Sequence, residues 1–218
     1  MAALSTTAKV LENRVLGGGS FLLRFERRQM TFRTGQYVSI GVADHREQRE
    51  YSIFSGENDP DLTVLIKEVE GGLVSKRLAR LVPGDILKVD GPFGYFTLDE
   101  ALKAGAPVLF IATGTGISPF HGMISTYPDL VFRCLHGVRT LEDLPLLEGF
   151  DRSKVISCVS REAGSDFHGR VTTYLRENPI DPTAHAFLCG NCDMIYEAFD
   201  ILRAAGLGSQ QISTEVYF

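Results

Sequence analysis

Residues 108–120 read Val-Leu-Phe-Ile-Ala-Thr-Gly-Thr-Gly-Ile-Ser-Pro-Phe. The first five residues are apolar without interruption, which is typical of a strand buried on both faces of a sheet. The glycines at 114 and 116 indicate a tight turn, and Ser118 and Pro119 suit the cap and the first position of a helix. A buried strand, a glycine turn and a helix in direct succession predict a parallel sheet with helical crossovers.

This alternation of strand and helix patterns continues through the second half of the chain. Buried-strand patterns cover residues 108–112, 130–136, 154–159 and 186–188, and helical patterns cover 118–126, 141–148, 170–177 and 194–205. We therefore expect an α/β nucleotide-binding domain with a parallel sheet over residues 104–218.

The first half of the chain has a different pattern. Short β-rich runs separated by Gly, Pro, Asn or Asp cover residues 10–16, 21–27, 37–42, 49–54, 62–69 and 86–90. Such spacing predicts an antiparallel barrel or sandwich. One helical pattern, at 73–81, interrupts it. We place this domain at residues 1–103 and the boundary near residue 103.

Composition and charge narrow the class of protein. The chain has 218 residues, of which 44% are hydrophobic and 22% charged, with a net charge of −5. Neither half carries the basic surplus of a nucleic-acid-binding protein. No apolar run reaches the roughly 20 residues of a membrane span, and we expect no secretory signal at the N-terminus. Four scattered cysteines do not suggest a disulfide framework. We expect a cytoplasmic protein.

Residues 49–52 read Arg-Glu-Tyr-Ser and carry the first candidate binding motif. The planar guanidinium of Arg49 could pair with a pyrophosphate. Tyr51 could stack on an aromatic ring, and the Ser52 hydroxyl could form a hydrogen bond with a ring nitrogen. An alternating strand with one buried tyrosine explains the motif equally well.

Three further stretches carry candidate anion sites. Residues 71–75, Gly-Gly-Leu-Val-Ser, place glycines before a helix start, as residues 114–118 do, and backbone N–H groups there attract phosphate. The 114–118 stretch departs from the G-x-G-x-x-G fingerprint, and a structural turn remains the alternative for both. Ser160, Arg161 and Arg170 could hold an additional phosphate; solvated surface arginines are the alternative.

The C-x-x-C spacing of Cys189 and Cys192 allows a redox disulfide or a zinc site. No second ligand pair accompanies it, and a thioredoxin-like motif would lie near the start of its domain. We therefore expect neither chemistry, and no metal.

The order of these motifs carries more information than any one of them. Arg-x-Tyr-Ser, Gly-Gly-x-x-Ser, Gly-Pro-x-Gly at 91–94, Gly-Thr-Gly-Ile-Ser-Pro-Phe, Cys-Gly and a terminal aromatic pair follow one another. This series resembles the ferredoxin–NADP(+) reductase family over nearly the whole chain. The resemblance implies an N-terminal FAD-binding Greek-key barrel and a C-terminal NADP-binding α/β domain.

The resemblance also implies roles for individual residues. Arg49 would bind the flavin pyrophosphate, Tyr51 would stack on the isoalloxazine ring, and Ser52 would lie beside flavin N5. Thr115 would belong to the NADP pyrophosphate loop. The implied cofactor-binding set is Arg49, Tyr51, Ser52, Ile53, Gly71, Gly72, Leu73, Val74, Ser75, Thr115, Gly116, Ser160, Arg161, Arg170, Tyr217 and Phe218.

The implied catalytic residues are Ser52, Cys189 beside the nicotinamide, and Glu215. The terminal ring, Tyr217 or Phe218, would cover the flavin face as a movable lid, and we favour Tyr217. The implied activity is transfer of electrons from NADPH through FAD to ferredoxin or flavodoxin, which basic residues of the first half would attract. The alternatives are an NADH-dependent reductase component of an oxygenase, a flavin or ferric reductase, and a non-catalytic nucleotide-binding regulatory subunit.

Overall fold

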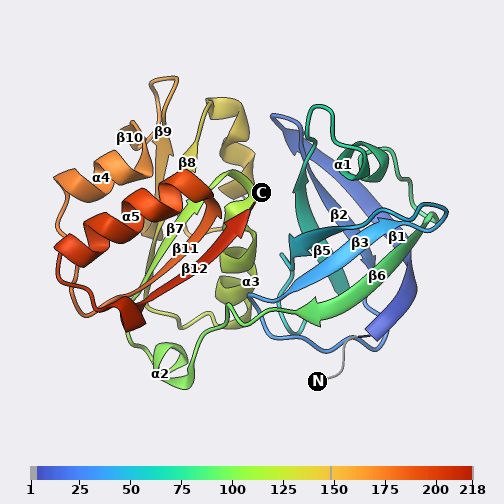
Figure 1. The fold of residues 1–218 in the computed structure, drawn as a ribbon, viewed down its shortest axis with the longest axis horizontal. Coiled ribbons are helices and arrows are strands. Elements are labelled where there is room, and N and C mark those ends of the chain that lie inside the picture. Colours follow the sequence, from blue (N-terminus) through green and yellow to red (C-terminus); the bar gives the residue numbers. More distant parts are fainter. Residues whose placement is uncertain (1–3, 148, 218) are drawn as a thin grey trace. The chain divides into compact units, whose positions relative to one another are not determined.

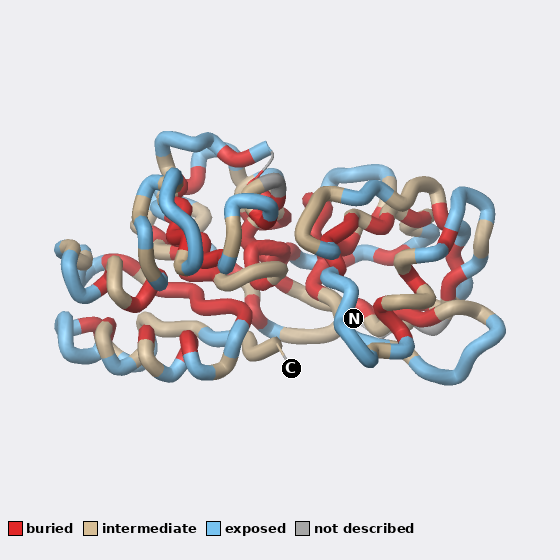
Figure 2. Tube along the Cα trace, turned by 90° about the horizontal axis from the view of Figure 1, so that it is seen from above, coloured by how far each residue is buried: buried red, intermediate tan, exposed pale blue. Residues whose placement is uncertain are grey.

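The computed structural model describes residues 4–147 and 149–217 (Figure 1). The chain divides into two compact units, one comprising residues up to 97 together with 118–126, the other comprising 98–117 and 127 onward. In each unit, buried strand residues are enclosed by exposed loops (Figure 2). The predicted domain boundary near residue 103 stays a prediction. The two compact units differ from the predicted domains because residues 98–103 group with the second unit and residues 118–126 with the first.

Six strands of the described residues form an antiparallel sheet in the first unit, in the order β4-β3-β6-β1-β2-β5. They are β1 (Leu4–Gly17), β2 (Ser20–Glu26), β3 (Tyr37–Val42), β4 (Arg49–Ser52), β5 (Asp61–Lys67) and β6 (Ile86–Phe93). The two ends of this order are joined, because Ile53 forms a bridge with Val64 and the Phe54 N–H donates to the Thr63 carbonyl at 2.8 Å. The sheet is therefore a closed Greek-key barrel, as predicted.

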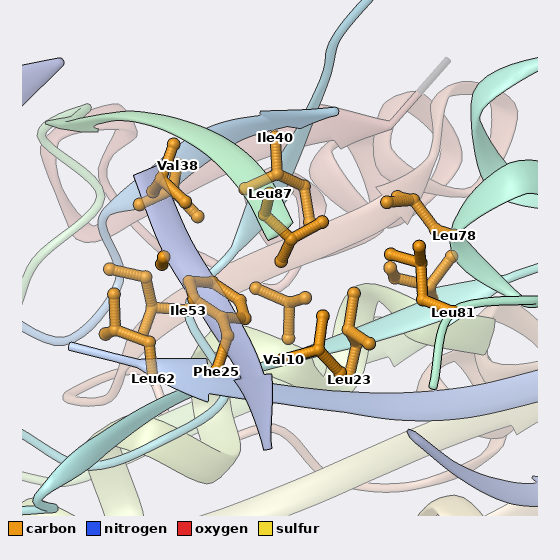
Figure 3. Packing of buried hydrophobic residues seen from close by; sticks show 14 of the residues in the cluster. Val10, Leu23, Phe25, Val38, Ile40, Ile53, Leu62, Leu78, Leu81 and Leu87 are labelled. Atoms are coloured by element: carbon orange, nitrogen blue, oxygen red, sulfur yellow. The ribbon is translucent and has the colours of Figure 1, made fainter. Parts of the chain in front are cut away.

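Alternate residues of these strands fill the barrel (Figure 3). Leu23 and Phe25 of β2, Val38 and Ile40 of β3, and Leu87 of β6 are all completely buried. This period of two is what a strand with one face on a core requires.

The helix α1 (Val74–Leu78) adds Leu78 to this core, and Leu81 follows it (Figure 3). It is shorter than the predicted 73–81. The side-chain amide of Asn13 donates to the carbonyls of Leu78, Ala79 and Leu81 at 3.1, 3.2 and 2.9 Å. Asn13 thus supplies a donor to carbonyls at the end of the helix and just beyond it, where no intrahelical donor is available.

The helix α3 (Ser118–Thr126) groups with the barrel unit, although its sequence continues from a strand of the other unit. The Ser118 hydroxyl donates to the carbonyl of Ser52 at 3.0 Å. The His121 ring stacks on Phe54 with centroids 3.7 Å apart, and its Nδ1 lies 2.8 Å from the Phe54 carbonyl oxygen. The prediction that Ser118 caps the helix is wrong. A 3-10 turn, η1 (Gly114–Ile117), precedes it, and Ser118 is the first residue of α3.

The second unit contains a parallel sheet of six strands among the described residues, in the order β10-β9-β8-β7-β11-β12. They are β7 (Val108–Thr113), β8 (Phe132–Val138), β9 (Val155–Val159), β10 (Phe167–His168), β11 (His185–Asn191) and β12 (Ile212–Tyr217). β8, β9 and β10 are added one after another on one side of β7, and β11 then pairs with the other side of β7. The topological switch point therefore lies between β7 and β11.

The helices α4 (Val171–Glu177) and α5 (Cys192–Ala204) pack on this sheet through one apolar cluster (Figure 1). The remaining elements are α2 (Glu100–Lys103), η2 (Leu141–Leu147), η3 (Arg152–Lys154) and η4 (Ser209–Gln211). The predicted α/β architecture is confirmed. None of the helices in the described part of the chain is long and apolar enough to cross a membrane.

Three predictions of local structure need correction. The pattern at 141–148 forms a 3-10 helix over 141–147, and residue 148 lies outside the described residues. Pro145 explains the difference, because proline lacks the N–H that would start the α-helical ladder. The strands β10 and β12 were not predicted. The terminal motif lies in β12, so Glu215 and Tyr217 belong to the edge strand of the sheet.

Gly122 makes the close packing of α3 on the barrel testable. A Cβ at this position would lie 2.9 Å from the Ser55 carbonyl oxygen and 3.3 Å from that of Ile53. Alanine would gain up to about 1 kcal/mol in helix propensity, but crowding against fixed backbone costs about 1–3 kcal/mol. We expect Gly122→Ala to lower the free energy of unfolding in urea. Ser125→Ala, an exposed change in the same helix, should leave it within about 0.5 kcal/mol. A stabilised Gly122→Ala would contradict the packing.

Candidate functional site

β4 presents the Arg-Glu-Tyr-Ser motif in the first unit. Strand alternation places Arg49 and Tyr51 on one face and Ser52 on the other. Arg49 is exposed, and among the described residues its guanidinium donates only to the Gln48 carbonyl, at 2.8 Å. Tyr51 packs against the barrel core, and burial raises its pKa to about 12. The motif thus offers an available cation beside a phenol that remains neutral.

Ser52 and Ile53 are held in place by hydrogen bonds of their backbone groups. Ser52 is buried, and its carbonyl accepts the Ser118 hydroxyl. Ile53 is completely buried, and its N–H donates to the Gln36 carbonyl at 3.0 Å. A contact between Ile53 and a ligand would therefore involve the backbone, not the side chain.

Residues 71–75 form the turn that leads into α1. Gly71 has a φ of +78°, in the left-handed region that favours glycine. The Ser75 hydroxyl accepts the Val69 N–H at 3.1 Å, and Gly72 lies so close that a Cβ would meet Ser75 Oγ at 3.0 Å. Leu73 is exposed, whereas its neighbour Val74 is buried in the core. The turn is closed by internal bonds, and the first N–H groups of α1 have no intrahelical acceptor.

The fold brings these two motifs to one side of the barrel. Arg77 in α1 forms an ion pair with Glu47, at 2.9 Å, just before β4. α1 also contacts β3, the strand paired with β4. An exposed arginine, a helix start and a half-buried phenol fit the pyrophosphate and the flat ring of FAD.

In the second unit, the Gly-Thr-Gly turn meets the Cys-Gly pair at the switch point. A Cβ on Gly116 would lie 2.6 Å from the Cys189 carbonyl carbon and 2.8 Å from the Gly190 nitrogen. A Cβ on Gly190 would lie 2.7 Å from the Thr113 carbonyl oxygen. The two strand ends are therefore in backbone contact. Ligands of open α/β sheets bind at this place, outside the carboxyl ends of the strands, and these residues fit a dinucleotide.

His136 of β8 supports the same turn from inside. It is completely buried, and its Nε2 lies 2.9 Å from the Gly114 carbonyl oxygen. Burial lowers its pKa to about 4; the Gly114 bond and Asp143 oppose the shift, and Arg152 adds to it.

Cys189, Glu215 and Tyr217 lie together at the ends of β11 and β12. Cys189 pairs in register with Glu215, and its Sγ is 3.9 Å from Glu215 Oε2. Burial is the main reason that the pKa of the thiol is raised well above its usual value, and the charge of Glu215 is the second. A hydrogen bond from Tyr217 opposes the shift. A protonated thiol is a poor nucleophile, which argues against a redox role for the C-x-x-C pair. Phe218 lies outside the described residues.

No group of three or more His, Cys, Asp or Glu residues in the described part of the chain could hold a metal ion.

The predicted phosphate-binding residues follow the ends of two paired strands. β9 and β10 run in parallel, with Val159 opposite His168, and the Gly169 N–H donates to the Val159 carbonyl at 2.9 Å. Ser160 and Arg161 follow the end of β9, and Arg170 follows the end of β10, at the same edge of the sheet.

Arg139, which sequence reasoning missed, joins them. The Arg161 N–H donates to its carbonyl at 3.0 Å, and both side chains are exposed. Glu162, the residue after Arg161, accepts the Leu141 N–H at 2.8 Å, and the charge of Arg170 helps to lower the pKa of Glu197. Arg139 follows β8 directly, and Arg161 is the second residue after β9, so strand position could have revealed Arg139. No local pattern in the sequence indicates that His136 contacts Gly114 or that Ser118 contacts Ser52.

Two family models match the chain: the oxidoreductase FAD-binding domain over residues 9–98 and the oxidoreductase NAD-binding domain over residues 110–199. The ferredoxin–NADP reductase B of Sorangium cellulosum (strain So ce56) is 31% identical over 223 residues, which cover 89% of this chain and 90% of the relative. The chain belongs to the ferredoxin–NADP reductase family. It is an FAD-dependent oxidoreductase with a second domain for a nicotinamide nucleotide.

Other members of the family extend this comparison. The toluate 1,2-dioxygenase electron transfer component of Pseudomonas putida is 29% identical over 82% of this chain, which spans 56% of that relative. The ferredoxin NADP+ reductase of Neisseria gonorrhoeae, solved with bound FAD and NADP, has a TM-score of 0.88 at 21% identity and covers 98% of this chain and 99% of its own. The latter likeness shows a shared fold.

The buried His136 predicts a dependence of stability on pH. The unfolded imidazole takes up its proton near pH 6.5, and the folded one near pH 4. Between these values the unfolded state binds more protons, so stability is lost as pH falls from 6.5 to 4. The full shift corresponds to roughly 3 kcal/mol.

His136→Gln, which cannot titrate, should lose correspondingly less stability over this range. The test is urea unfolding of both proteins at pH 7.5, 6, 5 and 4. Parallel losses in the two proteins would contradict the burial of a neutral imidazole.

Proposed function

We propose that the chain is an NADPH-dependent reductase that passes electrons from NADPH through FAD to ferredoxin or flavodoxin. The observation that carries the NADPH preference is the set of exposed arginines at 139, 161 and 170, gathered where β8, β9 and β10 end. Three guanidinium groups suit the 2′-phosphate that distinguishes NADP from NAD. Glu162, an acidic side chain next to Arg161, already accepts the Leu141 N–H.

In this proposal each motif has a binding or positioning role. Bound FAD supplies the chemistry, accepting a hydride from the nicotinamide and releasing its electrons singly. Arg49 and the 71–75 turn hold the flavin pyrophosphate, and Tyr51 stacks on the ring. The 114–116 turn holds the nucleotide pyrophosphate.

Ser52, Cys189 and Glu215 are the residues we propose to position the hydride transfer. The Ser52 backbone is fixed by Ser118, and the Cys189 thiol stays protonated beside Glu215. A neutral thiol can lie against the nicotinamide ring without an opposing charge. Tyr217, which donates a hydrogen bond to Cys189, remains our preferred lid over the flavin; the Phe218 alternative remains open.

Ferredoxin or flavodoxin is proposed as acceptor because relatives so named align over most of their length. The basic residues expected to attract an acidic partner are partly neutralised. Within the barrel unit, Arg24 forms ion pairs with Glu12 and Asp61. Arg28 forms one with Glu26, and Arg77 forms one with Glu47.

An NADH-dependent oxygenase reductase is the second candidate. The similarity to the toluate 1,2-dioxygenase component favours it. That relative is longer than this chain, so the likeness is confined to part of it.

The proposed function predicts a yellow protein that NADPH reduces anaerobically faster than NADH does. The reduced protein should then pass electrons to ferredoxin or flavodoxin. In Arg161→Ala/Arg170→Ala, the KM for NADPH should rise about 10- to 100-fold, because charge-assisted bonds to phosphate are lost. The KM for NADH should not change.

Arg133→Ala is the matched control, because this exposed arginine lies at the opposite end of β8. It should leave both KM values unchanged. A wild-type chain that prefers NADH would favour the oxygenase-reductase candidate. A colourless protein unable to take up FAD would favour a regulatory subunit and sink the proposal.

The residues assigned to hydride transfer can be tested separately. Ser52→Ala and Cys189→Ala should slow flavin reduction by NADPH about tenfold or more in stopped-flow measurements, with FAD content retained, because reacting groups are mispositioned. Cys158→Ala removes another buried thiol of the same sheet and should not affect the rate. Unchanged rates in the first two variants would remove both assignments.

A further inference from the structure

His136 is completely buried, yet only one of its ring nitrogens is satisfied. Nε2 lies 2.9 Å from the Gly114 carbonyl oxygen, whereas Nδ1 has no hydrogen-bond partner among the described residues. An unpartnered buried polar atom costs free energy. An apolar side chain would avoid this cost, so the value of a histidine here lies in the bond to Gly114.

The direction of that bond follows from its partner. A carbonyl oxygen only accepts, so Nε2 carries the proton and Nδ1 is the bare nitrogen. Burial keeps the imidazole neutral at physiological pH, since its pKa is lowered to about 4. This tautomer is therefore a permanent property of the site.

The bond to Gly114 also orients the next amide. In a planar trans peptide, the C=O of one residue and the N–H of the next point in opposite directions. The Gly114 carbonyl points inward to the buried His136, so the Thr115 N–H points away from it. Thr115 belongs to the first turn of η1, where N–H groups have no intrahelical acceptor.

Gly114 itself does not enforce this orientation. Its φ of +52° lies in the left-handed region, and a Cβ there would meet nothing within 4 Å. Glycine is permissive, so an external contact must select the conformation. Neighbouring Thr113 is fixed through its hydroxyl, which accepts the Asn191 N–H at 2.9 Å. His136 provides the corresponding restraint for the peptide that follows.

We propose that His136 is a positioning residue for the nicotinamide nucleotide: by holding the Gly114 carbonyl inward, it aims the Thr115 N–H at the pyrophosphate. This inference rests on the proposed function, which assigns pyrophosphate binding to the 114–116 turn. The histidine does not touch the ligand, and it acts through one peptide unit.

The test measures binding by calorimetry with two probes, NADP+ and 2′-AMP, which carries the 2′-phosphate but no pyrophosphate. We expect His136→Leu to bind NADP+ about tenfold more weakly, the effect of one hydrogen bond to a charged group, and to bind 2′-AMP as wild type does. His136→Gln, whose amide nitrogen can replace Nε2, should restore most NADP+ affinity. Cys134→Ala, two residues earlier on the same buried face of β8, should leave both affinities unchanged.

The outcomes separate the inference from the proposed function. Wild-type protein that binds neither probe would refute the proposed function, and the inference with it. Wild-type protein that binds both, together with a His136→Leu variant that binds NADP+ equally well, would overturn the inference alone. A glutamine variant as weak as the leucine variant would also overturn it, because the donor would not be the cause.

A measurement on the unmodified protein covers the case in which these variants fail to fold. Nitrogen-15 NMR of the imidazole at pH 7 should show a neutral ring with the proton on Nε2. A proton on Nδ1, or a charged ring, would contradict the hydrogen bond on which the inference depends.

Discussion

The backbone contact between Gly116 and the Cys189–Gly190 peptide is the constraint on which the second unit depends. No side chain fits between these segments, since a Cβ on Gly116 would lie 2.8 Å from the Gly190 nitrogen. The contact joins the carboxyl ends of β7 and β11 at the switch point of the sheet. It sets the path of the 114–117 turn. It also buries Cys189, and with it the end of β11 to which β12 adds Glu215 and Tyr217.

Much of this arrangement could be predicted, because it depends on residues close in sequence. The apolar run of β7 followed by glycines specified a buried strand and a turn, and β3 appears at the predicted residues 37–42. The β-rich runs of the first half likewise specified an antiparallel barrel. The order of the motifs then selected the family, which no single motif could do.

The remaining features depend on contacts between distant residues, which local patterns do not encode. The donor that Asn13 supplies to the end of α1 comes from 65 positions earlier in the chain. Ser118 looked like a helix cap, but its hydroxyl bonds to Ser52, 66 residues away, and α3 groups with the barrel. His136 sits in an ordinary apolar strand pattern. In the candidate site, the assigned residues could be named, but their partners could not.

Among the described site residues, the arginines are exposed and charged, whereas the buried titratable groups are neutral. Solvation explains this difference. Arg49, Arg139, Arg161 and Arg170 are exposed, so their guanidinium groups keep their hydration until an anion replaces it. Tyr51, His136 and Cys189 are at least half-buried, and burial shifts each pKa toward the uncharged form. Exposed guanidinium groups of this kind suit the phosphates of the proposed cofactors. In the proposed function, Tyr51 and Cys189 would lie beside the redox rings without a charge of their own, and Glu215 would be the acidic group next to the Cys189 thiol. In the proposed function, buried neutral groups and exposed cations would thus have complementary roles in binding.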